Sequence, residues 1–181
     1  FKNKKLINYK TWILNKTLFK PFQLDKNLEK LIQDKNITSS YSWIRLFDET
    51  ITSLRFPYRK KYLNSSEILN LLSDNKRSTR KIAAKSIGKV LGNNVKLFST
   101  ITNTLAKDKA INDSWRKIKS PVTLRNISNV VEDEVVETLA QTVVSSYSNI
   151  SHRYYKIKAG WFGSKTMKYW DRNAPLPFQN N

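Results

Sequence analysis

The sequence lacks cysteine altogether and contains one histidine, one methionine and four glycines in 181 residues. The absence of cysteine excludes disulfides and thiolate metal sites, and it is typical of proteins in a reducing compartment. No apolar run approaches the length of a membrane span. The apolar part of the basic N-terminus is interrupted by Asn8 and Lys10, which does not fit a signal peptide. We therefore expect a cytoplasmic protein with no membrane partner.

The scarcity of glycine leaves few tight turns of the kind that β-hairpins need. Apolar residues instead recur at helical spacing along nearly the whole chain. The sequence shows no internal repeat of constant period. These features predict an all-α fold, built as several helices of a large helical body rather than as a compact four-helix bundle.

Caps, prolines and apolar spacing predict seven or eight helices. They are a short helix over 6–14, a helix capped by Asp25, a helix over 43–54, a helix beginning at 64–67, and helices over 75–91, 95–118, about 129–143 and 151–162. We expect Asp74 to cap the fifth, Gly92 and Gly163 to end helices, and Pro121 to end the longest. The segment 171–177 is predicted to be extended.

Several apolar stripes are expected to be buried. They comprise Leu28, Leu31 and Ile32; Trp43, Ile44, Phe47, Ile51 and Leu54; Ile68, Leu69, Leu71 and Leu72; Ile82, Ala83, Ile87, Val90 and Leu91; Leu97, Phe98, Ile101, Leu105, Trp115 and Ile118; and Val131, Val135, Leu139 and Val143.

The basic, aromatic run PYRKKYL at 57–63 is the first break in this helical texture. It predicts a loop or a small hairpin without glycine. We take it as a boundary between a first domain over 1–58 and a second over 59–181.

Side chains that could carry catalysis or hold a metal ion are few. His152 follows a predicted cap at Ser151 and has no second ligand at helical spacing, so we interpret it as an ordinary helix residue. Glu132, Asp133, Glu134 and Glu137 form an acidic cluster, which suits the positive end of a helix dipole better than acid–base or magnesium chemistry.

Two further carboxylates lie in the middle of the longest predicted helix. Asp108 and Asp113 are best interpreted as partners of nearby Lys107 and Lys109, each pair of low energetic value. No glycine-rich phosphate loop, Gly-x-Ser-x-Gly or His-Glu-x-x-His motif occurs.

The formal charge of +19 favours a polyanion partner, because lysine and arginine contacts to phosphate drive nucleic-acid binding. Aromatic and basic side chains also alternate near the C-terminus, at Tyr154, Tyr155, Lys156, Lys158, Trp161, Lys168, Tyr169, Trp170 and Arg172. Neither feature is specific to nucleic-acid binding. Lysine-rich surfaces also arise from AT-rich codon usage, and an aromatic helix face is commonly buried while its lysines reach water.

The order of several motifs distinguishes these alternatives. The runs HRYYKIKAGWFG at 152–163 and YWDRNAPLP at 169–177 follow NVVEDEVV at 129–136 and NTLAKDK at 103–109. An arginine- and alanine-bearing helix over 74–91 and SWIRLFDETITSLRF at 42–56 precede them. In this order they resemble the oligoendopeptidase F family of zinc oligopeptidases, over about residues 24–177.

The resemblance implies a largely helical metallopeptidase that cleaves short peptides in an internal channel. It implies zinc held by two histidines of a His-Glu-x-x-His helix and a later glutamate. That helix lies downstream of the alanine-proline-leucine run and is absent here. We therefore assign no catalytic, metal-binding or cofactor-binding residue to this chain, and expect zinc only in the full-length family enzyme. On this basis we expect an inactive fragment whose possible partner is a separately encoded catalytic half, with a basic nucleic-acid-binding module as the alternative.

Overall fold

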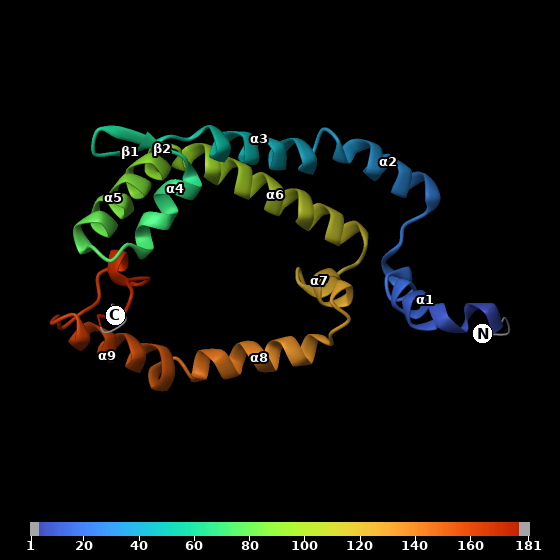
Figure 1. The fold of residues 1–181 in the computed structure, drawn as a ribbon. Helices are drawn as coiled ribbons and strands as arrows, with labels where there is room; N and C mark the ends of the chain where they lie inside the picture. Colours follow the sequence, from blue (N-terminus) through green and yellow to red (C-terminus); the bar gives the residue numbers. More distant parts are fainter. Residues whose placement is uncertain (1–3, 178–181) are drawn as a thin grey trace. The chain divides into compact units, whose positions relative to one another are not determined.

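The computed structural model describes residues 4–177; the outermost residues of the two expected domains, 1–3 and 178–181, lie outside the described part. The described chain is mostly helical, with one two-stranded hairpin, so the all-α prediction is confirmed. Its elements are η1 (Lys4–Tyr9), α1 (Lys10–Thr17), η2 (Lys20–Phe22), α2 (Lys26–Asn36), α3 (Ser40–Ser53), β1 (Phe56–Tyr58), β2 (Lys61–Leu63), α4 (Ser65–Asn70), η3 (Leu71–Ser73), α5 (Arg77–Asn93), α6 (Val95–Trp115), α7 (Thr123–Ser128), α8 (Asp133–Ser145), η4 (Ser148–His152), α9 (Arg153–Trp161) and η5 (Tyr169–Asp171). Figure 1 labels the α-helices and strands.

The chain divides into two compact units, and each unit joins segments that are distant in sequence. One unit contains residues 1–42 and 103–143, and the other contains residues 43–102 and 144–181. Each unit draws on both sides of residue 58, so the division into domains 1–58 and 59–181 stays a prediction. None of the described helices is long and apolar enough to cross a membrane.

The second unit has its core around the hairpin. Phe56, Ile68 and Ala83 are buried together, and seven partly buried side chains pack against them: Leu54, Tyr58, Leu63, Leu71, Leu72, Ile87 and Val90. The elements β1, α4, η3 and α5 therefore form one packed group (Figure 1). The hairpin forms without glycine because Arg59 adopts a left-handed φ of 53°, and Phe56 then pairs with Leu63.

Local capping chemistry starts two helices where the sequence predicts. The Asp25 carboxylate accepts hydrogen bonds from the backbone N–H groups of Asn27 and Leu28 at 3.0 and 3.2 Å. Asn64 and Glu67 form a complete capping box at the start of α4. These signals lie within a few residues of each other, and the surrounding fold does not override them.

Two predicted helix ends and one predicted helix cap are wrong. Gly92 lies inside α5, which continues to Asn93, and the Asn94 amide donates to the Val90 carbonyl at 2.9 Å. Asp74 lies two residues before the N-cap residue Lys76, and its carboxylate accepts the Lys76 backbone N–H at 2.7 Å. The longest helix ends at Trp115 rather than before Pro121, because Lys117 turns to a left-handed φ of 57°.

Residues 116–152 also depart from the prediction. A short helix, α7, forms where none is expected, and Val130 turns at φ 54° before α8 begins at Asp133. A π-helical turn, η4, precedes α9. Gly163 does terminate this region as predicted, at φ 63°. The segment predicted to be extended begins inside η5, since Asp171 is the last residue of that 3₁₀ turn.

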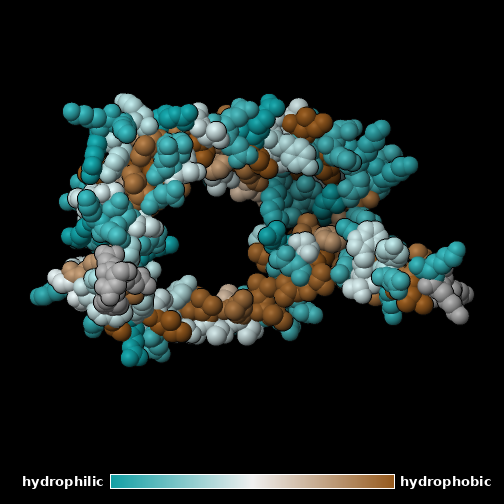
Figure 2. Space-filling model, viewed as in Figure 1, coloured by the Kyte–Doolittle hydropathy of each residue, from teal (hydrophilic) through white to brown (hydrophobic). Residues whose placement is uncertain are grey.

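Most of the predicted helices form, but several of the apolar faces expected to be buried are exposed. Ile44, Phe47, Trp115, Val135, Leu139 and Val143 all belong to stripes expected to be buried, and all are exposed. Phe47 packs edge to face against Phe98, with the two ring centroids 5.7 Å apart, and is still 41% exposed. Figure 2 shows apolar surface along α8, in line with these exposed side chains. The prediction of buried stripes on α3 and α8 is therefore wrong for this chain.

Candidate functional site

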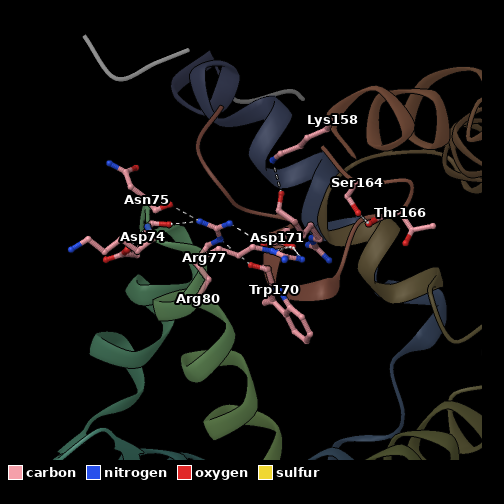
Figure 3. Close-up of polar contacts among 11 residues, drawn as sticks. Asp74, Asn75, Arg77, Arg80, Lys158, Ser164, Thr166, Trp170 and Asp171 are labelled. Atoms are coloured by element: carbon pink, nitrogen blue, oxygen red, sulfur yellow. Dashed lines mark hydrogen bonds and ion pairs between the residues drawn. The ribbon is translucent and has the colours of Figure 1, made fainter. Parts of the chain in front are cut away.

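The most buried polar cluster lies where α5 meets the segment around η5, within the second unit (Figure 3). Arg80 is 1% exposed and Asp171 is 3% exposed. The Arg80 guanidinium donates to Asp171 Oδ1 at 2.8 Å. Arg77, one turn earlier on α5, donates from Nε to Asp171 Oδ2 at 2.9 Å. One carboxylate therefore binds two guanidinium groups, and we call these three residues the Asp171 clamp.

Arg80 makes further bonds that fix the backbone around it. It donates to the carbonyls of Asp74 and Asn75 at 2.7 and 3.0 Å, and to the carbonyl of Trp170 at 3.2 Å. Arginine suits this position because its planar fork offers five donors at once. The result joins the start of α5 to a segment about ninety residues later in the chain.

Lys158 fixes the same segment from α9. It is 4% exposed, and its ammonium donates to the Arg172 carbonyl at 2.9 Å. Burial lowers the pKa of Lys158 most, the nearby charge of Arg80 lowers it further, and Asp171 acts in the opposite direction. Three cations thus surround the single carboxylate of Asp171.

The clamp holds structure rather than performing chemistry. Both oxygens of Asp171 accept from arginine, so the carboxylate is a poor general base. The sequence motifs contain Arg77, Arg80 and Asp171 but do not indicate that they pair. Two arginines one turn apart in an alanine-bearing helix are the sequence signal that could have suggested a distant acidic partner, because a buried arginine is normally paired.

His152 does not join other metal ligands. It lies at the end of η4, is exposed, and borders a shallow hollow of about 380 Å³ with Ser148, Asn149, Arg153 and Lys156. Its imidazole ring lies 6.1 Å from the Tyr147 ring. The cationic neighbours would repel a metal ion rather than help to hold it.

The acidic cluster at the start of α8 has structural partners. Asp133 Oδ1 accepts from the Asn126 amide at 2.7 Å, and Glu137 accepts from Gln141 at 2.7 Å. Asp133 and Glu134 lie in the first turn of α8, as the helix-dipole interpretation predicts. Over residues 4–177, no group of three or more histidine, cysteine, aspartate or glutamate side chains could hold a metal ion. The residues present do not fit the zinc site that the family resemblance implies.

The two carboxylates of α6 differ in their surroundings. Asp113 accepts from Lys109 at 2.5 Å, as the sequence predicts. Asp108 lines an apolar groove of about 360 Å³ in the first unit, between α2 and the second half of α6. The groove is lined mainly by leucine, isoleucine and tryptophan side chains: Leu24, Leu28, Leu31, Ile32, Ile111 and Trp115.

Another ion pair that the sequence does not indicate involves Arg116, the residue that follows α6. Arg116 and Glu29 form two parallel bonds of 2.6 and 2.8 Å, and Glu29 also accepts from the Leu24 backbone at 2.9 Å. The Arg116 bond is the main cause that lowers the pKa of Glu29 to about 2, and the Leu24 bond is the next. The pair joins α2 to the residue that follows α6, across 87 residues of sequence.

The C-terminal aromatic residues are less buried than a packing helix requires. Tyr154, Trp161 and Tyr169 are 42, 43 and 67% exposed, while Trp170 is half-buried with Lys81 over its ring. Tyr154 contacts Tyr155 edge to face. The alternative that the sequence left open, an aromatic helix face buried in the fold, therefore holds only in part: Tyr154 and Trp161 each keep about two fifths of their surface exposed.

Comparison with known proteins points to one family. Residues 1–56 match the sequence model of the oligopeptidase F family. A protein assigned as an oligoendopeptidase F from Bacillus anthracis str. Ames matches in fold, with a TM-score of 0.72 and 17% identity, over 97% of this chain and 33% of that one. A protein assigned as a peptidase from Chlamydophila abortus matches with a TM-score of 0.78 and 16% identity, over 97% of this chain and 30% of that one.

The chain therefore spans about a third of the length of the solved structures it resembles. At these identities the likeness shows the fold. No curated protein sequence gives a significant match. The resemblance to the oligoendopeptidase F family, first indicated by the ordered motifs, is confirmed.

Proposed function

We propose that this chain is part of an oligoendopeptidase F-like zinc metallopeptidase that hydrolyses short peptides, and that the 181-residue chain alone is inactive. The observation that carries the proposal is the fold match over 97% of the chain to a protein assigned as an oligoendopeptidase F. The family match over residues 1–56 supports it independently.

The chemistry of the residues present supports inactivity. A catalytic zinc site needs three protein ligands and an open position for water. This sequence has one histidine, and the described carboxylates form no ligand group. We derive no catalytic step from this chain. Its contribution is the helical body, including the buried Asp171 clamp that fixes the course of residues 169–174.

We further propose that the zinc ligands lie on a complementary polypeptide that is encoded separately. The complete assembly would then act on short peptides in the cytoplasm, a location supported by the absence of cysteine. Affinity purification of the chain from its source cells is expected to recover a second chain that contains His-Glu-x-x-His.

The direct test is a peptidase assay on the purified chain. A quenched fluorescent peptide is incubated with the chain, with and without added zinc, next to a full-length family enzyme as positive control. We expect no zinc-dependent cleavage by the chain. Cleavage that requires zinc and is stopped by a chelator would contradict the inactivity.

A second candidate function is nucleic-acid binding, favoured by the formal charge of +19 and by the exposed aromatic rings near the C-terminus. Tyr154, Trp161 and Tyr169 alternate in sequence with Lys156 and Lys168. The salt dependence of binding separates this function from a surface that is basic by composition alone.

A further inference from the structure

Helix α8 is a complete helix in which no residue is buried. Val135, Leu139 and Val143 recur at every fourth position and are 54, 63 and 46% exposed. They form one apolar stripe, visible as the apolar surface along α8 in Figure 2. We call Val135, Leu139, Val143 and the flanking Glu132 and Glu134 the α8 face.

A helix of this length is marginal in water without a partner. Isolated helices of fewer than about 12–15 residues gain too little from propagation to offset nucleation, and packing of an apolar face normally stabilises them. α8 has 13 residues and a clear apolar stripe. The described fold leaves that stripe uncovered, so a partner is needed to stabilise it.

The charge around α8 limits the chemistry of that partner. Residues 126–152 contain four acidic residues and no lysine or arginine, within a chain of formal charge +19. Glu132 is the residue immediately before α8, and Glu134 lies in its first turn, about 100° around the helix from Val135. The α8 face is therefore apolar and acidic, and it suits a segment that is apolar and basic.

Such a segment exists in this chain. No acidic residue precedes Asp25, whereas lysines recur through α1 and its flanks. Leu14 and the C-cap residue Leu18 are 47 and 44% exposed and lie about 40° apart around the helix, and no residue of α1 is buried. The exposed Lys10 and Lys16 lie at either end of α1.

We propose that the α8 face of one copy binds α1 of a second copy, and that the same contact forms reciprocally. Each pairing covers apolar side chains of α8 and of the α1 region that a single copy leaves exposed. Each also places lysines beside glutamates. Repulsion between the remaining positive charges is largely screened at physiological salt, where the Debye length is about 8 Å, so the local pairs dominate. The contact does not depend on the proposed peptidase function.

The first experiment measures the oligomeric state by sedimentation equilibrium over protein concentrations of roughly 1 to 100 μM, the range suited to a small interface. The wild-type chain is expected to dimerise as concentration rises. Leu139→Lys should raise the dissociation constant by about tenfold or more, since it removes a leucine that the proposed dimer buries. Leu69→Lys is the matched control on α4, where Leu69 is 53% exposed against 63% for Leu139, and it should leave the dissociation constant unchanged.

The second experiment exchanges the charges. Glu132→Lys with Glu134→Lys, and separately Lys10→Glu with Lys16→Glu, should each weaken the dimer. An equimolar mixture of the two variants should restore it, because both reciprocal contacts again join opposite charges. Asp48→Lys with Glu49→Lys makes the same charge change on exposed residues of α3 and serves as the control. Circular dichroism confirms that each variant remains helical.

Three outcomes overturn the proposal. The first is a wild-type chain that stays monomeric throughout, as expected if α1 covers α8 within one copy or if another protein does. The second is a dimer that is unaffected by Leu139→Lys. The third is a mixture of charge variants that fails to restore a dimer lost in each alone.

Discussion

The two arginines that bind the Asp171 carboxylate differ in how deeply they are buried. The Arg80 side chain is 1% exposed, and the Arg77 side chain is 57% exposed. Removing one partner of a buried ion pair leaves an uncompensated charge, whereas an exposed pair contributes little because water solvates both groups. The two bonds to Asp171 have similar lengths, so length alone does not rank them.

We predict that Asp171→Asn lowers the free energy of unfolding by about 3 kcal/mol, because Arg80 stays buried without its counter-charge. Arg77→Gln should cost less than about 1 kcal/mol. Urea unfolding followed by circular dichroism measures both. Equal losses for the two variants would show that burial does not decide the strength of the clamp.

The Glu29–Arg116 pair predicts a pH dependence. The pKa of Glu29 is lowered from 4.5 to about 2, chiefly by the Arg116 bond. A lowered pKa in the folded state means that the unfolded chain binds the proton more tightly. The pair therefore stabilises the fold above pH 4.5, and this contribution is lost as the pH falls toward about 2.

Glu29→Gln tests this pH dependence directly. The side chain is 36% exposed, so we expect a loss of only about 1 kcal/mol at neutral pH, and almost none near pH 2. Urea midpoints of wild type and variant across this pH range give the difference. Carbon-13 NMR of the Glu29 carboxyl gives its pKa, and a midpoint near 4.5 would contradict the predicted shift.

At the scale of single elements, the helix caps formed by neighbouring residues could be predicted from the sequence. The elements that each helix packs against could not. Asp25 and the Asn64–Glu67 box bind their own helix starts, so a few neighbouring residues suffice to place them. The predicted helix end at Gly92 shows the limit of such local signals. The helix α5 continues to Asn93, and Asn94 is its C-cap residue. Left-handed turns at Lys117 and Val130 carry no glycine signal and therefore escaped prediction.

Apolar spacing predicts which residues share a helix face, but it does not say what covers that face. On α4, Ile68 is completely buried and its neighbour Leu69 is 53% exposed, although both appear equally apolar in sequence. The difference arises because Ile68 packs with Phe56 and Ala83 from other elements. The same limit explains the exposed stripe on α8.

We predict that Ile68→Ala lowers the free energy of unfolding by about 2–5 kcal/mol, through lost transfer energy and the cavity that remains. Leu69→Ala, one residue later in the same helix, should cost well under about 1 kcal/mol. Thermal unfolding of the two variants provides the comparison. A larger loss at Leu69 would mean that this leucine is covered in solution.

At the scale of the whole molecule, the family resemblance was predictable from motif order, while no active site could be assigned. The motifs are spread over most of the chain, and the fold match covers 97% of it. Paired residues such as Arg80 with Asp171 lie 91 positions apart, which no local pattern reports. The zinc chemistry implied by the resemblance needs ligands that this sequence does not contain.

The formal charge of +19 is also a property of the whole molecule, and its meaning can be measured. If lysines are only spread over the surface, binding to a short single-stranded oligonucleotide should be detectable at about 20 mM salt and lost by about 200 mM, because counterion release dominates it. Fluorescence anisotropy, measured over a series of salt concentrations, gives the slope of the logarithm of the binding constant against that of the salt concentration. Alanine in place of Tyr154, Trp161 and Tyr169 should then leave binding unchanged. Tight binding that persists at physiological salt and falls when these rings are removed would instead establish stacking on nucleic acid, and the second candidate function with it.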